Sequence, residues 1–198
     1  DSLHMCDEPN LGAVFCWMQP QIFLSELPRL FQTAVDQLRV WGSSVMKYQT
    51  IDELIETLYD CISGPPGGQD WERDREIYHP RALITRTRIE DEQPVAYTFS
   101  YDEFVKATIP LLAGRSFYEI EIGRKTDIFG QIAHVYSTYE ARETPDHPDI
   151  QFRGVNMIHL WNDGIAEDGE PCGRWWIMGM IWDNEREGLA LPEEWLSR

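Results

Sequence analysis

Three long runs of β-type residues make up the last third of the chain, and they limit its fold more than any other feature. The runs cover residues 130–143, 150–162 and 173–185, and each is rich in β-branched and aromatic side chains. A segment containing Pro and Asp follows the first run, and a loop containing Gly follows the second. Strand-like runs separated by turns predict an antiparallel meander.

Helical patterns come earlier in the chain. Apolar residues recur at helical spacing over residues 24–42, which predicts an amphipathic helix. Thr50 and Ser100 each begin a capping box, in which a Glu three positions later can reach back to the start of a helix. Asp70 can cap a shorter helix. Pro110 predicts a kink or an early end in the helix that follows Ser100.

Two further strands are predicted over residues 82–90 and 117–129. Arg86 and Arg88 lie on one side of the first of these, where we expect them to be solvated or paired with acidic residues. Because helices precede a run of strands, the fold class is predicted to be α+β, with helices packed on one face of a curved antiparallel sheet.

The net charge of the chain argues against two kinds of binding partner. The chain of 198 residues carries 17 basic and 34 acidic residues, a formal net charge of −17. Such a surface repels phosphate backbones and anionic lipids, so we expect no binding to nucleic acid or to a membrane. No apolar run reaches the roughly 20 residues that span a bilayer.

The sequence predicts neither a disulfide framework nor a metal or cofactor site. Cys6, Cys16, Cys61 and Cys172 are scattered without CxxC spacing, so we expect reduced thiols and a cytoplasmic location. The cysteines and His4 match no zinc pattern. No Walker or dinucleotide fingerprint is present.

An ordered set of short segments resembles the nuclear transport factor 2-like superfamily, in particular its SnoaL-like branch. The set follows the order helix, helix, short strand, helix and four long strands. The segments that carry the resemblance are residues 62–71, 78–84, 117–119, 133–139, 153–156, 173–177 and 182–185.

The resemblance implies a cone-shaped, cystatin-like domain in which a bent sheet wraps around helices and encloses a pocket. It covers residues 46–192. Residues 1–45 are then an N-terminal extension with one amphipathic helix, and residues 193–198 are a C-terminal tail. Members of this superfamily frequently form dimers through the outer face of the sheet.

Two functions of different classes are compatible with the resemblance. The first is a cofactor-free isomerase, dehydratase or cyclase that acts by proton transfer on a small apolar or ring-containing molecule. The second is a non-catalytic domain that binds a ligand or assembles as a dimer. The position that aligns with the acidic oxyanion-hole residue of ketosteroid isomerases is Met157, and the fold alone does not choose between the two functions.

Alternation along the strands gives two possible linings for the pocket, because successive side chains point to opposite faces. By analogy with the last strand of ketosteroid isomerases, the first lining is preferred. It places His134 and His159 opposite each other as the candidate catalytic pair, since two close imidazoles lower each other's pKa. Its ligand-binding residues are Tyr136, Arg153, Met157, Met178, Met180 and Trp182.

The competing lining brings Tyr139, Asn156 and Asp183 into the pocket instead. A β-bulge in any strand exchanges part of the assignment. On the preferred assignment, the opposite face is apolar and predicts a homodimer. The residues on which this prediction rests are Ala133, Val135, Ile158, Leu160, Trp175, Ile177 and Ile181.

Overall fold

Six strands form one curved, open sheet in the computed structural model of the protein, which describes residues 47–196. The strand order is β2-β1-β6-β5-β4-β3, and all neighbours are antiparallel except β1 and β6, which run parallel. The strands are β1 (Tyr78–Glu90), β2 (Gln93–Ser100), β3 (Tyr118–Phe129), β4 (Ile132–Arg142), β5 (Phe152–Asn162) and β6 (Trp175–Asn184).

The α+β prediction is therefore confirmed, with a mixed sheet in place of a wholly antiparallel one. Strand β2 was not predicted. It pairs with β1 through a tight turn in which Asp91 and Glu92 both have positive φ angles, and neither residue is the Gly or Asn that usually reveals such a turn in a sequence.

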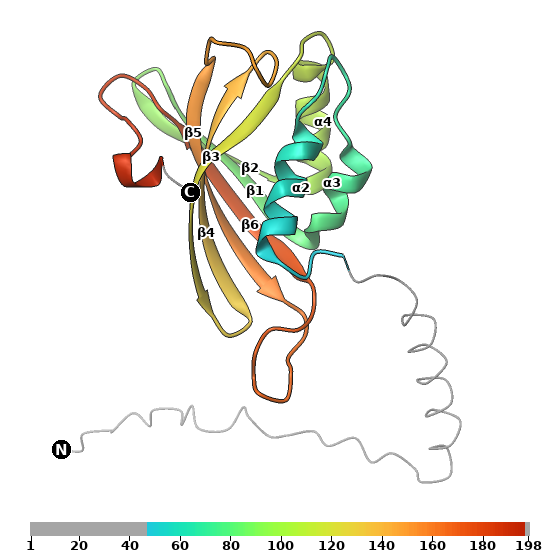
Figure 1. The fold of residues 1–198 in the computed structure, drawn as a ribbon. Helices are drawn as coiled ribbons and strands as arrows, with labels where there is room; N and C mark the ends of the chain where they lie inside the picture. The colour runs from blue at the N-terminus through green and yellow to red at the C-terminus, as the bar shows by residue number, and fades with distance from the viewer. Residues whose placement is uncertain (1–46, 197–198) are drawn as a thin grey trace, which may run out of the picture. The chain divides into compact units, whose positions relative to one another are not determined.

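Helices α2 (Ile51–Ile62), α3 (Trp71–Ile77) and α4 (Tyr101–Leu112) lie together on one side of the sheet (Figure 1). Each helix begins at a predicted cap: the side chains of Thr50, Asp70 and Ser100 accept a hydrogen bond from a backbone N–H in the first turn. Only Ser100 forms the complete capping box.

Two predictions about helices remain untested by the structure. Helix α4 includes Pro110 and ends at Leu112, before Gly114, so the expected kink or fraying at this end stays a prediction. Pro110 has no N–H to donate to the carbonyl of Lys106, and the helix ends two residues after it. The amphipathic helix predicted over residues 24–42 lies outside the described residues.

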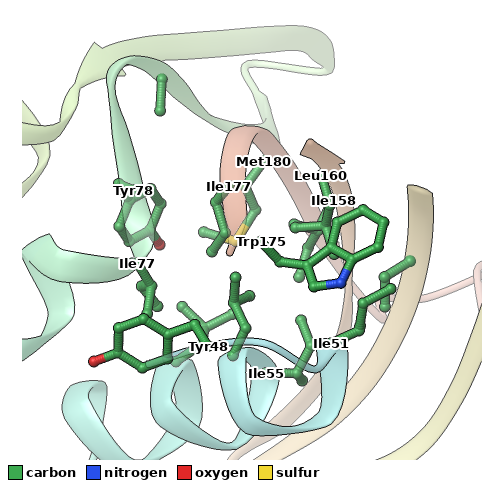
Figure 2. Close-up of a cluster of buried hydrophobic side chains, with 14 of the residues drawn as sticks. Tyr48, Ile51, Ile55, Ile77, Tyr78, Ile158, Leu160, Trp175, Ile177 and Met180 are labelled. Carbon is green, nitrogen blue, oxygen red and sulfur yellow. The ribbon is translucent and has the colours of Figure 1, made fainter. Parts of the chain in front are cut away.

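The hydrophobic core fills the space between the helices and the inner face of the sheet (Figure 2). Side chains from α2 and α3 meet side chains from β5 and β6, and the central ones are completely or almost completely buried. They include Ile55, Ile77, Ile158, Leu160, Trp175 and Ile177.

This core corrects the prediction of which sheet face is covered. Six of the seven residues expected on an exposed apolar face are core residues: Ala133, Val135, Ile158, Leu160, Trp175 and Ile177. In β4 and β5, these side chains and the ones that share their alternation point toward the helices. The alternate side chains, which were expected to line the pocket, therefore point outward in those strands. Only Ile181, which is 39% exposed, is on the outer face.

A register shift in β6 exchanges its two faces part of the way along. His159 pairs with Gly179 and Leu160 pairs with Ile177, which leaves Met178 without a partner on β5. An extra residue of this kind reverses the alternation that follows it. Trp175 and Ile177 therefore face inward before the bulge, and Met180 and Trp182 face inward after it.

The C-terminal segment returns to the outer face of the sheet. A short 3-10 helix, η1 (Glu193–Trp195), places the backbone oxygen of Trp195 where it accepts a hydrogen bond from Thr138 Oγ1 at 2.6 Å. The Trp195 ring lies 5.3 Å from the ring of Tyr136. Gly123 leaves room for this contact, because a Cβ atom there would lie 2.0 Å from the same oxygen.

The face assignment predicts opposite effects for two neighbouring substitutions on β5. Ile158 is fully buried, so Ile158→Ala should lower the free energy of unfolding by about 2–5 kcal/mol. His159 is exposed on the other face, so His159→Ala should cost about 0.5 kcal/mol or less. Urea unfolding followed by circular dichroism measures both. Equal losses would contradict the assignment.

Candidate functional site

A cavity of about 450 Å³ opens between the inner face of the sheet and helices α2 and α4. Its apolar wall is largely aromatic and comes from both layers. The main apolar residues are Leu58, Phe104, Phe117, Phe152, Met180 and Trp182. Polar side chains interrupt this wall, and they include Asp74, Arg86, Arg115, Glu119, Tyr139, Asn156, Asn184 and Glu185. A cavity of this size that combines an aromatic wall with converging polar groups is typical of a small-molecule site.

Glu119 is an acid without a partner in this cavity. Its carboxylate forms no hydrogen bond or ion pair within residues 47–196, while its backbone is held by the side chain of Ser63 at the end of α2. Burial among apolar walls disfavours the charged carboxylate and raises the pKa of Glu119 to about 8. Glu119 is therefore protonated at neutral pH and can exchange a proton within the cavity.

Asp74 is a second perturbed acid, but it is tied into the structure. Burial raises the pKa of Asp74 to about 7, and the hydrogen bond that Tyr101 donates to Oδ2 at 2.9 Å opposes this rise. Only 2% of the residue is exposed, and its Oδ1 atom has no partner among the described residues. The Asp74–Tyr101 contact joins α3 to α4 beside the cavity.

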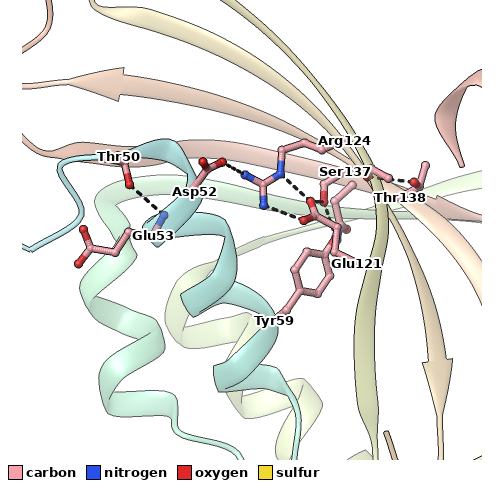
Figure 3. A network of polar contacts seen from close by, with 10 residues as sticks. Thr50, Asp52, Glu53, Tyr59, Glu121, Arg124, Ser137 and Thr138 are labelled. Carbon is pink, nitrogen blue, oxygen red and sulfur yellow. Dashed lines mark hydrogen bonds and ion pairs between the residues drawn. The ribbon is translucent and has the colours of Figure 1, made fainter. Parts of the chain in front are cut away.

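Figure 3 shows a chain of polar contacts that includes Tyr59, Ser137 and Glu121. This chain continues to Asn156, which borders the cavity. Asn156 Nδ2 donates to the Tyr59 hydroxyl at 3.2 Å, and that hydroxyl lies 2.7 Å from Ser137 Oγ. Ser137 in turn donates to Glu121. Because each hydroxyl has one proton, the direction is settled: Tyr59 donates to Ser137. The amide of Asn156 is thus fixed by buried partners.

The far end of this chain is an ion pair made possible by a second bulge. Arg124 donates to both carboxylate oxygens of Glu121, at 2.8 and 2.7 Å, and also contacts Asp52. Residues three apart in a regular strand point to opposite faces. Here Glu121 pairs with Tyr139 and Gly123 with Thr138, so Ile122 is the extra residue and Arg124 returns to the inner face.

Arg86 also lies beside the cavity, on the inner face of β1 in register with Trp182. It is half-buried, and it forms no hydrogen bond or ion pair within the part of the chain that the structure describes. It acts electrostatically on Tyr139, whose hydroxyl donates to Asn184 Oδ1 at 2.8 Å. The neighbouring Arg88 behaves as expected of both arginines, since it pairs with Glu90.

The structure separates the side chains that the preferred lining had grouped together. Met180 and Trp182 border the cavity, because they follow the bulge in β6. The other six residues do not: Tyr136, Arg153, Met157, His134 and His159 lie on the outward parity, and Met178 is the bulge residue. Of the competing lining, Tyr139 and Asn156 border the cavity, and Asn184 takes the place expected for Asp183.

The two histidines do face each other, as predicted, but on the outer surface. His134 pairs with His159 in the sheet, and their ring centroids are 4.5 Å apart. Burial and the neighbouring imidazole lower the pKa of His134. The His134 ring also stacks on Tyr136, with centroids 4.6 Å apart. The sequence identified the pair correctly and assigned it to the wrong face.

Sequence reasoning missed Glu119, Asp74 and Arg86 as cavity residues. For Glu119 a signal existed: an acidic residue lies within a predicted strand on the same parity as a second one, Glu121. For Asp74 the signal was its position three residues before the apolar Ile77, on the same side of a helix. Both signals depend on knowing which face of the element is covered.

Within residues 47–196, no group of three or more His, Cys, Asp or Glu side chains is arranged to hold a metal ion. Cys61 and Cys172 are free thiols. No helix among these residues is long and apolar enough to cross a membrane.

Comparisons with known proteins identify the fold. A protein of unknown function with a cystatin-like fold from Nostoc punctiforme PCC 73102 superposes with a TM-score of 0.50 at 9% identity, over 68% of this chain and 88% of that one. The chain has a cystatin-like fold. No protein-family model and no curated protein matches the sequence.

Two further solved structures that resemble the chain belong to proteins with different names. The β subunit of a proposed aromatic-ring-hydroxylating dioxygenase from Novosphingobium aromaticivorans DSM 12444 matches with a TM-score of 0.50 at 13% identity, over 74% of this chain and 92% of that one. A proposed dehydratase of the NTF2-like family from Streptomyces avermitilis matches at 0.46 and 10% identity, over 69% and 94%. At such identities the likeness establishes the fold alone.

The raised pKa of the Glu119 carboxyl predicts that the free energy of unfolding depends on pH. Unfolded Glu119 releases its proton near pH 4.5, whereas folded Glu119 keeps it up to about pH 8. The folded state is therefore favoured at low pH and loses stability as pH rises between these values. Between pH 5 and pH 9, the free energy of unfolding of the wild type should fall. For Glu119→Gln, this fall should be smaller by on the order of 3 kcal/mol.

Urea unfolding at several pH values measures this difference, and Glu56→Gln on the exposed side of α2 is the matched control. The control should follow the wild type. If Glu119→Gln also follows the wild type, the Glu119 carboxyl is not held protonated by the cavity.

Proposed function

We propose that the protein is a cofactor-free enzyme that transfers a proton on a small apolar, ring-containing molecule, in the manner of an isomerase, dehydratase or cyclase. The observation that carries this proposal is the unpartnered Glu119 carboxyl in an apolar cavity. A general acid–base catalyst works best with a pKa near the working pH, and burial supplies this shift.

Glu119 is preferred to the other acids of the cavity because its carboxyl is free to react. Asp74 is almost completely buried and accepts from Tyr101, so movement of its proton disturbs the α3–α4 contact. Glu185 also borders the cavity, but its carboxylate accepts from the backbone N–H of Leu191 at 2.8 Å. Glu119 thus takes the catalytic role that the sequence had suggested for His134 and His159.

Asn156 is suited to a second role in such a reaction. Removal of a proton next to a carbonyl group places negative charge on the carbonyl oxygen, and an oriented N–H donor stabilises that charge. One N–H of the Asn156 amide donates to Tyr59, which fixes the amide and leaves the second N–H for a ligand. The buried ion pair of Glu121 and Arg124 keeps this arrangement rigid.

The proposal predicts proton exchange at carbon in a suitable probe. The probe 2-tetralone is an apolar bicyclic ketone whose hydrogens next to the carbonyl exchange with D2O, and proton NMR follows this exchange. We expect the wild type to accelerate exchange, with a rate that rises with pH through about 8. Glu119→Gln should reduce the acceleration about 100-fold, which is typical for loss of a general base.

Two variants separate chemistry from binding. His159→Gln alters the outer face and should leave exchange unchanged. Trp182→Ala should weaken binding of the fluorescent apolar probe N-phenyl-1-naphthylamine, while Glu119→Gln should retain it. No acceleration by the wild type, together with binding that depends on Trp182, would favour the alternative function, a non-catalytic ligand-binding domain.

We also propose that the protein is a homodimer that associates through the outer face of the sheet. The basis differs from the one the sequence suggested. Leu83, Ile181 and Trp161 lie on this face and are 56%, 39% and 38% exposed. Leu83 and Ile181 come from neighbouring strands, and an exposed apolar area of this kind is typical of a protein interface.

Light scattering after size exclusion tests the dimer. The wild type should have twice the mass of the chain, and Ile181→Glu should give a monomer, because a buried, unpaired charge opposes association. Leu189→Glu is the matched control, since Leu189 is 45% exposed in a turn outside the sheet, and it should remain dimeric. A monomeric wild type at all concentrations contradicts the proposal.

A further inference from the structure

Arg86 has an unusual environment in a chain of this charge. Most of the other basic residues that the structure describes have acidic partners, among them Arg73, Arg75, Arg124 and Arg142. Arg86 has none, although acidic residues outnumber basic ones two to one, 34 against 17. A half-buried guanidinium without an anion gives up part of its hydration without compensation.

Alternation along β1 directs Arg86 toward the cavity. Ala82 and Ile84 share its parity and are core residues, whereas Leu83 lies on the outer face and is 56% exposed. Arg86 pairs in register with Trp182, another residue of the cavity wall. The guanidinium is thus beside an aromatic wall and within electrostatic reach of Tyr139 across the cavity.

Other charges around the cavity leave Arg86 as the best anion partner. Arg115 also borders the cavity, but it is exposed and its guanidinium rests on the ring of Phe117, 5.5 Å from its centroid. Glu185 is engaged with the Leu191 backbone. Glu119 stands on β3, separated from β1 by β6, β5 and β4. A ligand can therefore meet a cation at one wall and an acid at another.

We propose that the ligand of this cavity is an apolar ring compound that carries an anionic group, such as a carboxylate, and that Arg86 binds this group. The inference rests on the proposed function, since it names the substrate class of the same cavity. A planar guanidinium binds a carboxylate through two parallel hydrogen bonds, and the apolar surroundings strengthen them. The apolar body of the ligand then packs on Trp182 and Met180, in reach of Glu119.

This arrangement also fits the charge of the whole molecule. A net charge of −17 repels anions over long distances, so an anionic ligand binds only where a local cation outweighs that repulsion. Arg86 supplies such a cation in the wall of the cavity. A neutral ligand of the same shape leaves the guanidinium without a partner and should bind less tightly.

A matched pair of ligands tests the proposal with the full chain. N-phenyl-1-naphthylamine reports occupancy by its fluorescence, and it is displaced either by 2-naphthoate or by its neutral analogue 2-naphthamide. We expect the wild type to bind 2-naphthoate about tenfold more tightly than 2-naphthamide. Arg86→Gln should remove this preference by weakening 2-naphthoate alone, and Arg86→Lys should keep most of it.

Arg81→Gln is the control, because Arg81 lies on the opposite face of the same strand and is exposed. It should bind both compounds like the wild type, and thermal unfolding verifies that each variant is folded. Equal binding of the two compounds by the wild type overturns the anion proposal, and so does a preference that survives Arg86→Gln. If neither compound nor the reporter binds, the proposed small-molecule function fails as well.

Discussion

Packing of three helices on the concave face of a curved sheet is the constraint on which the rest of this structure depends. A six-stranded open sheet has two faces, and only one of them is covered by α2, α3 and α4. Where helix and strand side chains meet fully, they form the core around Ile55 and Ile177. Where the curvature carries the sheet away from the helices, a cavity remains. The cavity is therefore a consequence of the packing, and its chemistry depends on which side chains point inward.

Two bulges set that chemistry. The extra residue in β6, Met178, changes which side of the strand faces the helices, so that Trp182 joins the cavity wall. The extra residue in β3 brings Arg124 to the same face as Glu121, and the ion pair fixes the polar chain that ends at Asn156. Each bulge disrupts a ladder locally and in return places a functional side chain that regular alternation excludes.

The fold could be predicted from the sequence to a large extent, because its signals are local. The caps at Thr50 and Ser100, the strand-like runs and the turns between them act over a few residues, and the structure contains the corresponding elements. The site could not be predicted in the same way. Its lining depends on the choice of face. The corrected choice places His134 on the outer face, while Glu119, which the sequence did not single out, borders the cavity.

Two further features could not be predicted from local sequence signals: the parallel pairing of β1 with β6, and the position of Arg86. Both depend on contacts between segments about a hundred residues apart, which no local pattern reports. The expectation for Arg86 and Arg88 was drawn from residue type alone. One of them pairs with Glu90, while the other reaches the cavity because β6 lies beside it.

Gly123 restricts how this sequence can change in evolution, because the C-terminal segment packs directly against it. Any side chain at this position collides with the backbone oxygen of Trp195 and displaces η1 from the sheet. Acceptance of a larger residue at 123 therefore requires a change in the segment that covers it. Among relatives of this protein, glycine at position 123 and a C-terminal segment that covers this part of the sheet should be inherited together, and lineages without the segment should be free to replace the glycine.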